Sequence, residues 1–405
     1  MKRYPYVIVG ASIAGLSAIA AIRSRDPVGI ILLIHGEKRL PYKRTQLSKQ
    51  LVGGFSGDEL AIYPSDWYLA NKVELLQGVR AISFEPSSRE LSLGTGEIVG
   101  YESLLISTGA EPTILDIPGT EYLSYLRWID QAETMRRRVR ETKTAVSIGF
   151  GVQSIELADQ FILAGLTTTL TGCQDTLMQS HLDLEASQRL EKRMVEAGVR
   201  VLRWGKTLEV HRTGSRYRVV AEEGETDTEM VCASVGATST TDFAASARIA
   251  LQDDKRHGVK IERDMRTGIE GVFAAGDCTA PLPGVSWGLW HSAQEAGTIA
   301  GINMAHGDLR PEPGPHRLKC EAFGGYLFSL NYSSVLLDEM AESRVLRNTP
   351  SLYFRVWQRD GRSVGAVLDI YPNPGQSITK PLGKCLERLI LDGARAEDIP
   401  ETLGL

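Results

Sequence analysis

The sequence has no closely spaced pair of cysteines. Its five cysteines are Cys173, Cys232, Cys278, Cys320 and Cys385, and the closest two lie 42 positions apart. Short C-x-x-C or C-x4-C spacings are typical of redox dithiols, zinc sites and iron–sulfur clusters. We therefore expect neither a metal site nor a local redox dithiol, and we expect each cysteine to be a small core or surface residue.

The sequence also lacks an excess of positive charge and a long apolar run. The formal net charge of −5 leaves no basic surface for nucleic acid. The uncharged stretch that follows Met1-Lys2-Arg3 and ends at Ile22 resembles a signal peptide or membrane anchor. However, it contains a glycine turn and is followed by a second apolar strand at Gly29–Ile34. We therefore expect no membrane span and a cytoplasmic location.

The composition is that of an ordinary soluble globular protein. Apolar residues make up 42% of the chain and charged residues 23%. A chain of 405 residues is too long for one compact core. Two or three domains are therefore expected.

The rest of the chain is organised around Tyr6–Arg23, YVIVGASIAGLSAIAAIR. An apolar strand, a tight turn and an Ala-rich helix follow one another, as at the start of a dinucleotide-binding βαβ unit. Small turn residues let backbone N–H groups and the helix N-terminus approach a pyrophosphate. The expected cofactor-binding residues are Gly10, Ser12, Ile13, Ala14 and Gly15. Ser12 replaces the second glycine of G-x-G-x-x-G, and a buried unit without a ligand is the alternative.

A second stretch of the same design is Ala145–Ala158, AVSIGFGVQSIELA, whose first glycine follows that of the first motif by 139 positions. Two such units are more specific than one. Here Gly149, Gly151 and Val152 are the expected nucleotide contacts, and Ser154 replaces the third glycine.

The strand that follows the second turn, Leu166–Leu170, ends at Thr171 without the acid that usually binds the adenosine ribose of NAD. Asp175 or Gln174 could serve instead. No arginine cluster stands there for a 2′-phosphate, so NAD is favoured over NADP. The alternative is that this unit has lost nucleotide binding.

Four further segments carry a resemblance to a known family. They are Leu40–Lys49 (LPYKRTQLSK), Leu104–Pro112 (LLISTGAEP), Thr267–Asp277 (TGIEGVFAAGD) and Trp287–Gly297 (WGLWHSAQEAG). The chain resembles the FAD-dependent pyridine nucleotide oxidoreductases, in particular the rubredoxin, ferredoxin and nitrite reductase branch. The resemblance covers essentially the whole chain.

The resemblance implies roles for individual residues at the FAD. Arg44 would contact the phosphates, Lys49 would lie close to the flavin ring, and Asp277 would bind the ribityl hydroxyls. A physical argument agrees for Lys49, since a cation near flavin N5 stabilises negative charge on the reduced ring. The remaining expected FAD contacts are Val79, Thr108, Gly109, Gly276 and Trp290.

Three acidic or glycine positions complete the expected site. Glu37 lies roughly 20 residues after the first turn, where an acid binds ribose hydroxyls, although it could be a solvated loop carboxylate. By the resemblance, Glu156 would face the nicotinamide and Gly236 would lie beside it. The catalytic candidates are Lys49 and Glu156, and a solvated helix carboxylate is the alternative for Glu156.

The expected fold is α/β, with two Rossmann-like three-layer nucleotide-binding domains and a small C-terminal α+β domain. The NAD domain is inserted in the FAD domain. We expect the FAD-binding domain at 1–112 and 239–310, the NAD-binding domain at 113–238 and the C-terminal domain at 311–405.

The resemblance implies an FAD-dependent oxidoreductase that passes electrons between NAD(H) and a one-electron redox protein or Fe–S subunit. The missing dithiol excludes the disulfide-reductase branch. A non-catalytic FAD-containing assembly or electron-transfer subunit, and an NADH oxidase, are the alternatives. The direction of electron flow stays open, as does the choice between a homodimer and a hetero-oligomeric complex.

Overall fold

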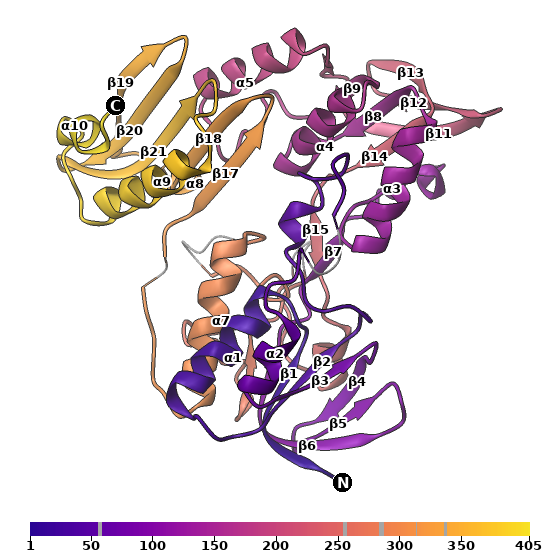
Figure 1. Ribbon diagram of the computed structural model, residues 1–405, viewed down its shortest axis with the longest axis vertical. Helices are drawn as coiled ribbons and strands as arrows, with labels where there is room; N and C mark the ends of the chain where they lie inside the picture. Colours follow the sequence, from indigo (N-terminus) through magenta and orange to yellow (C-terminus); the bar gives the residue numbers. More distant parts are fainter. Residues whose placement is uncertain (56–58, 254–256, 283–286, 313, 336–337) are drawn as a thin grey trace. The chain divides into compact units, whose positions relative to one another are not determined.

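The chain divides into two compact units. The computed structural model describes residues 1–55, 59–253, 257–282, 287–312, 314–335 and 338–405 (Figure 1). Unit 1 comprises Met1–Gln46, Phe55–Glu111 and Ala237–Gly314; unit 2 comprises Leu47–Gly54, Pro112–Gly236 and Pro315–Leu405. The segment Leu40–Lys49 is therefore divided between the two units.

Unit 1 is built on a sheet whose central strands are parallel and run in the order β3-β2-β1-β6-β16. These strands are β1 (Arg3–Val9), β2 (Ile31–His35), β3 (Val73–Gln77), β6 (Ile98–Ile106) and β16 (Val272–Ala274). The hairpin of β4 (Ala81–Glu85) and β5 (Glu90–Leu93) pairs antiparallel with the start of β6. Two short strands, β7 (Ala110–Pro112) and β15 (Ala237–Ser239), pair with each other. The helices are α1 (Ile13–Arg25), η1 (Arg44–Gln46), α2 (Ser65–Ala70), α6 (Asp242–Ser246) and α7 (Trp290–Met304).

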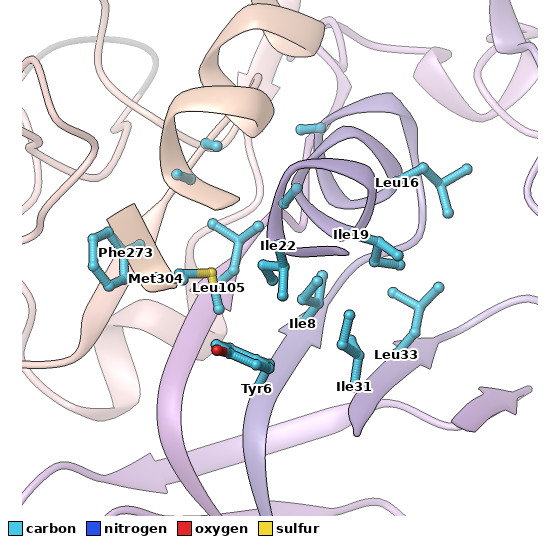
Figure 2. Close-up of a cluster of buried hydrophobic side chains, with 14 of the residues drawn as sticks. Tyr6, Ile8, Leu16, Ile19, Ile22, Ile31, Leu33, Leu105, Phe273 and Met304 are labelled. Atoms are coloured by element: carbon cyan, nitrogen blue, oxygen red, sulfur yellow. The ribbon is translucent and has the colours of Figure 1, made fainter. Parts of the chain in front are cut away.

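From Tyr6 to Val9, strand β1 is apolar and buried because both of its faces are covered. Tyr6 and Ile8 pack into the cluster that contains α1 and α7 (Figure 2). Val7 and Val9 point to the opposite face and pack with the β4–β5–β6 side of the sheet and α6. The continuous apolar run that opens the chain therefore forms the centre of unit 1.

Helices α1 and α7 approach each other through glycines of α7. A Cβ on Gly297 would lie 2.1 Å from the Ala14 carbonyl oxygen, and one on Gly301 would lie 2.3 Å from that of Ala18. From the first contact to the second, the residue number rises by four in both helices, so the two helices run parallel. Their N-termini, which carry partial positive charge, therefore point to the same end of the sheet, where β1 and β16 end.

Unit 2 begins with a second parallel sheet, in the order β10-β9-β8-β14. Its strands are β8 (Thr144–Ile148), β9 (Thr167–Thr171), β10 (Arg200–Leu202) and β14 (Met230–Ala233). The helices of this part are η2 (Thr120–Tyr122), α3 (Ile129–Glu141), α4 (Val152–Leu163) and α5 (Leu184–Glu196). A three-stranded antiparallel sheet consists of β11 (Thr207–Thr213), β12 (Arg216–Ala221) and β13 (Gly224–Thr228).

The last part of unit 2 is an antiparallel sheet in the order β17-β18-β21-β20-β19. Its strands are β17 (Arg317–Ala322), β18 (Gly325–Leu330), β19 (Glu342–Thr349), β20 (Leu352–Arg359) and β21 (Arg362–Ile370). Three helices accompany it: α8 (Tyr332–Val335), α9 (Gln376–Leu391) and α10 (Asp398–Leu403). Strands β20 and β21 form a hairpin with its turn at Asp360-Gly361. The expected α/β fold class with a C-terminal α+β part is confirmed.

Buried ion pairs join this antiparallel sheet to α5. Asp369 on β21 is fully buried and accepts two hydrogen bonds of 2.8 Å from the guanidinium of Arg193. Asp183, which caps α5 at the N–H of Ala186, also accepts the hydroxyl proton of Tyr353 at 2.5 Å. Paired charges are the form in which buried acids are tolerated.

Candidate functional site

The first glycine turn joins β1 to α1. At two of its glycines, neighbouring backbone atoms leave no space for a side chain. Gly10 has φ +106°, and a Cβ there would lie 2.1 Å from the Ser107 carbonyl oxygen. A Cβ on Gly15 would lie 2.3 Å from the Gly10 carbonyl oxygen. Ser12 is the N-cap of α1, but its side chain makes no capping hydrogen bond. The expected residues, which also include Ile13 and Ala14, thus form a helix N-terminus that fits an anionic pyrophosphate.

Next to this turn, the ends of β2 and β3 bring Glu37, Arg44 and Val79 into one corner. The Val79 N–H donates to the His35 carbonyl at 3.1 Å, and the Gly78 N–H donates to the Glu37 carbonyl at 2.9 Å. Arg44 donates to Oε1 of Glu37 at 2.8 Å. The Tyr42 hydroxyl donates to Oε2 of the same carboxylate at 2.9 Å. Two of the expected FAD contacts, Glu37 and Arg44, are therefore ion-paired with each other.

The ends of β6 and β16 place Thr108, Gly109 and Asp277 together, since these two strands are paired. Thr108 donates from Oγ1 to the Thr240 carbonyl at 2.6 Å, and the Thr240 N–H donates to the Gly109 carbonyl at 2.9 Å. The Ser239 hydroxyl donates to the Asp277 carbonyl at 2.8 Å. The expected contacts of this corner thus lie at the strand ends where α1 begins.

Gly276 and Trp290 connect this corner to the helices. Gly276 has φ +82°, and a Cβ there would lie 3.0 Å from the Ala14 Cβ. Trp290 is the first residue of α7, whose N-terminus points to the same end of the sheet as that of α1. All expected FAD contacts that belong to unit 1 therefore lie at the carboxyl ends of its parallel strands, which is where open α/β sheets bind ligands.

The second glycine turn joins β8 to α4 in unit 2. Gly149 has φ +116°, and a Cβ there would lie 2.4 Å from the Ser234 carbonyl oxygen. Gly151, in contrast, is exposed, and a Cβ there would meet no atom of the described residues within 4 Å. Val152 begins α4, and Gly236, with φ +129°, lies just beyond the end of the neighbouring strand β14. This open edge fits a second dinucleotide.

Ser154, which departs from the glycine pattern, is accommodated by the strand ends. Its hydroxyl is fully buried and lies 3.3 Å from the Ile148 carbonyl oxygen and 3.4 Å from that of Ser234. A hydroxyl can therefore occupy the third glycine position because either of two carbonyl groups can accept its one proton.

A polar cluster at the buried side of α4 unites both catalytic candidates. Glu156 is 5% exposed, and its Oε2 accepts the Ser48 hydroxyl proton at 2.5 Å. The Lys49 ammonium lies 3.6 Å from Oε1. Burial raises the pKa of Glu156, whereas Lys49 and then Ser48 oppose this effect. The carboxyl group is thus held by a cation and a hydroxyl in a poorly solvated place.

The segment Leu47–Gly54 is fixed to α4 by a further contact. The Val52 N–H donates to Oε1 of Gln160 at 3.1 Å, one helical turn beyond Glu156. Sequence reasoning missed Ser48, Gln160 and Tyr42. Ser48 and Tyr42 lie inside the Leu40–Lys49 motif, which is the signal that could have identified them, whereas no local pattern points to Gln160.

The cysteines are all free. Cys232, Cys278 and Cys320 are fully buried, and burial raises the pKa of each thiol. Within the residues that the structure describes, no group of three or more histidine, cysteine or acidic side chains could hold a metal ion. Across the same ranges, no helix has the length and apolar character to cross a membrane.

Comparison with known proteins identifies the family. The profile of the pyridine nucleotide-disulphide oxidoreductases matches residues 4–297. The chain belongs to this family. As a pyridine nucleotide-disulphide oxidoreductase, it is an FAD- and NAD(H)-dependent enzyme, and the enzyme class and cofactors expected from the sequence are confirmed.

Among its relatives is the epsilon subunit of the NADH-dependent phenylglyoxylate dehydrogenase of Aromatoleum evansii. It is 28% identical over 309 residues, which cover 74% of this chain and 72% of the relative. The NADH-rubredoxin oxidoreductase of Clostridium acetobutylicum is 27% identical, over 77% of this chain and 79% of that protein. A ferredoxin reductase structure from Rhodopseudomonas palustris has a TM-score of 0.83 and 22% identity, with both chains fully covered. The expected family is thereby confirmed, and the relatives found include a rubredoxin reductase.

Proposed function

We propose that this oxidoreductase passes electrons between NAD(H) and a one-electron redox protein or an Fe–S subunit, as its relatives' names indicate for them. FAD would occupy the domain at 1–112 and 239–310, NAD(H) the domain at 113–238, and residues 311–405 would form the C-terminal domain. The bound FAD would accept a hydride and pass its electrons on singly. Five free cysteines suit a reducing compartment, which supports a cytoplasmic location.

The observation that carries the proposal is the cluster that Ser48 and Lys49 form with Glu156, which lies on the first turns of α4. The helix begins at the open turn of Gly151, so Glu156 follows the expected pyrophosphate site by little more than one helical turn. Lys49 would supply positive charge where a reduced ring carries negative charge. Glu156 would orient Lys49 by its ion pair and face the nicotinamide. Ser48 would hold the carboxylate in that position.

The test is NADH-driven reduction of a carrier by the purified holoprotein. NADH should reduce oxidised ferredoxin or rubredoxin, followed by the visible absorbance of the carrier, only when the protein is present. Lys49→Met and Glu156→Gln should each slow this reaction by about tenfold or more, since general electrostatic stabilisation in active sites has this size. Rapid reduction of oxygen without any carrier would instead support the NADH oxidase.

A second candidate is a subunit of a larger redox complex. It is favoured by the similarity to the epsilon subunit of an NADH-dependent dehydrogenase, which covers 72% of that subunit. In this case NADH would bleach the flavin of the isolated chain, whereas free ferredoxin and rubredoxin would stay oxidised. Co-purification of an Fe–S protein with the chain from its native cells would separate the two candidates.

A further inference from the structure

The end of β9 lacks the acid that usually selects NAD, and two polar atoms there have no hydrogen-bond partner among the residues that the structure describes. Thr171, the last residue of β9, is 2% exposed, and its Oγ1 has no hydrogen-bond partner among the described residues. Within the same described ranges, Oε1 of Gln174 in the following loop is also buried without a partner. In dinucleotide-binding sheets, this strand end contacts the adenosine ribose.

Arg203 reaches this strand end from the end of the adjacent strand. Arg203 directly follows β10, which pairs with β9. Its Nε donates to the Asp175 carbonyl at 2.6 Å, and its guanidinium carbon lies 5.7 Å from the centre of the Phe150 ring. Phe150 belongs to the second glycine turn. The positive charge therefore lies between the turn and the loop after β9, the two segments that flank the adenosine half of a dinucleotide.

Glu191 on α5 occupies the guanidinium fork of Arg203. Nη1 of Arg203 donates to Oε1 of Glu191 at 2.9 Å, and Nη2 donates to Oε2. The side chains are 39% and 24% exposed, so the pair is accessible to a ligand from solvent. A bidentate pair of this kind uses the donors that would otherwise bind a phosphate.

We infer that Glu191 makes this enzyme select NADH over NADPH by occupying and neutralising Arg203 at the adenosine end of the site. The 2′-phosphate of NADPH carries between one and two negative charges and requires an arginine whose guanidinium N–H groups are free to bind it. It would instead meet a paired arginine and the carboxylate of Glu191. The 2′-hydroxyl of NADH makes no such demand. This inference rests on the proposed binding of NAD(H) by the domain at 113–238.

The test compares two ligands that differ only in the 2′-phosphate and undergo no hydride transfer. These are ADP-ribose and 2′-phospho-ADP-ribose, and their affinities for the holoprotein can be measured by titration calorimetry. The native protein should prefer ADP-ribose. Glu191→Gln should strengthen the binding of 2′-phospho-ADP-ribose by about tenfold or more, while the affinity for ADP-ribose should change less than about threefold. The KM ratio for NADPH and NADH should shift in the same direction.

Two controls distinguish an effect of the Glu191–Arg203 ion pair from the effect of removing any negative charge from α5. Glu196→Gln removes the same charge from the same helix, but Glu196 pairs with Lys192 at 3.9 Å and does not contact Arg203. It should leave the preference unchanged, and Arg203→Ala combined with Glu191→Gln should abolish the gain. A gain in either control, or no gain in Glu191→Gln, would overturn the inference. If neither the native protein nor any of the variants bound ADP-ribose, the proposed nucleotide site itself would be wrong.

Discussion

The two glycine turns have the same strand–turn–helix design but depart from the glycine pattern at different positions. In the first turn Ser12 stands at the second glycine position, and carbonyl groups leave no space for a Cβ at either Gly10 or Gly15. In the second turn the third glycine is Ser154, and Gly151 has no protein neighbour within 4 Å among the described residues. The folded chain therefore requires glycine at Gly10, Gly15 and Gly149, whereas it does not require one at Gly151, which agrees with the nucleotide contact proposed there.

The largest effect in this comparison is expected at Gly10. A valine there would combine a disfavoured φ of +106° with a Cβ 2.1 Å from a backbone oxygen. Gly10→Val should therefore lose the bound FAD almost completely. The ratio of flavin absorbance to protein, measured together with circular dichroism, checks this. Full flavin content in a folded variant would mean that the first turn does not hold FAD.

The corresponding change in the second turn should separate ligand binding from folding. Gly151 has φ −82° as the N-cap of α4 and open space beside it. Gly151→Val should keep its flavin, and its free energy of unfolding should stay within about 0.5 kcal/mol, as for most surface changes. Its KM for NADH should rise by about tenfold or more, because the side chain would occupy the pyrophosphate position.

Gly151→Ala is the matched control and should show a smaller rise in KM. An unchanged KM for NADH in Gly151→Val would place the nucleotide elsewhere and break the comparison between the two turns.

An intermediate effect, which depends on pH, is expected at the cluster below the second turn. Because burial raises the pKa of Glu156, its contribution to stability is fully present below the ordinary glutamate pKa and is lost as pH rises through the raised value. Lys49→Met removes the cation that opposes this rise. The variant should therefore lose more stability at pH 8 than at pH 5, by about 1–3 kcal/mol.

Urea unfolding at the two pH values measures this difference. The double variant with Glu156→Gln should lose the extra pH dependence. A loss that is equal at both pH values would show that Lys49 does not stabilise the ionised carboxylate.

The smallest effect is expected at Ser154. Ser154→Gly restores the family pattern but removes a buried hydroxyl and places a glycine in α4, at a cost of about 1 kcal/mol. The KM for NADH should change less than about threefold, since Ser154 packs against strand ends rather than the ligand edge. Thermal unfolding and steady-state kinetics would check both parts. A large change in KM with unchanged stability would give Ser154 a direct role in binding.

Much of this fold could be predicted because its signals are local. The apolar strands before each glycine turn, the Ala-rich helix α1 and the strand that precedes Asp277 each carry their pattern within about a dozen residues. The Asp360-Gly361 hairpin is also a local signal. These stretches formed the elements that their patterns indicated.

The contacts within the candidate site could not be predicted in the same way. Lys49 and Glu156 were each named, yet nothing in a linear pattern tells that Ser48 donates to Glu156, because the two residues lie 108 positions apart. Nor did the motif Leu40–Lys49 indicate that its last three residues group with unit 2. The Glu191–Arg203 pair was missed for the same reason, since its partners belong to a helix and a loop beyond the expected ribose-binding position.

The central claim is that NADH, held at the second turn, reduces a flavin held at the first. The most direct measurement is an anaerobic titration of the purified yellow protein with NADH and, separately, NADPH, followed by flavin absorbance. NADH should bleach the flavin stoichiometrically, and NADPH should be much less effective. If dithionite bleached the flavin but neither nucleotide did, the second turn would not bind a functional nucleotide, and the chain would be an electron-transfer or assembly subunit instead.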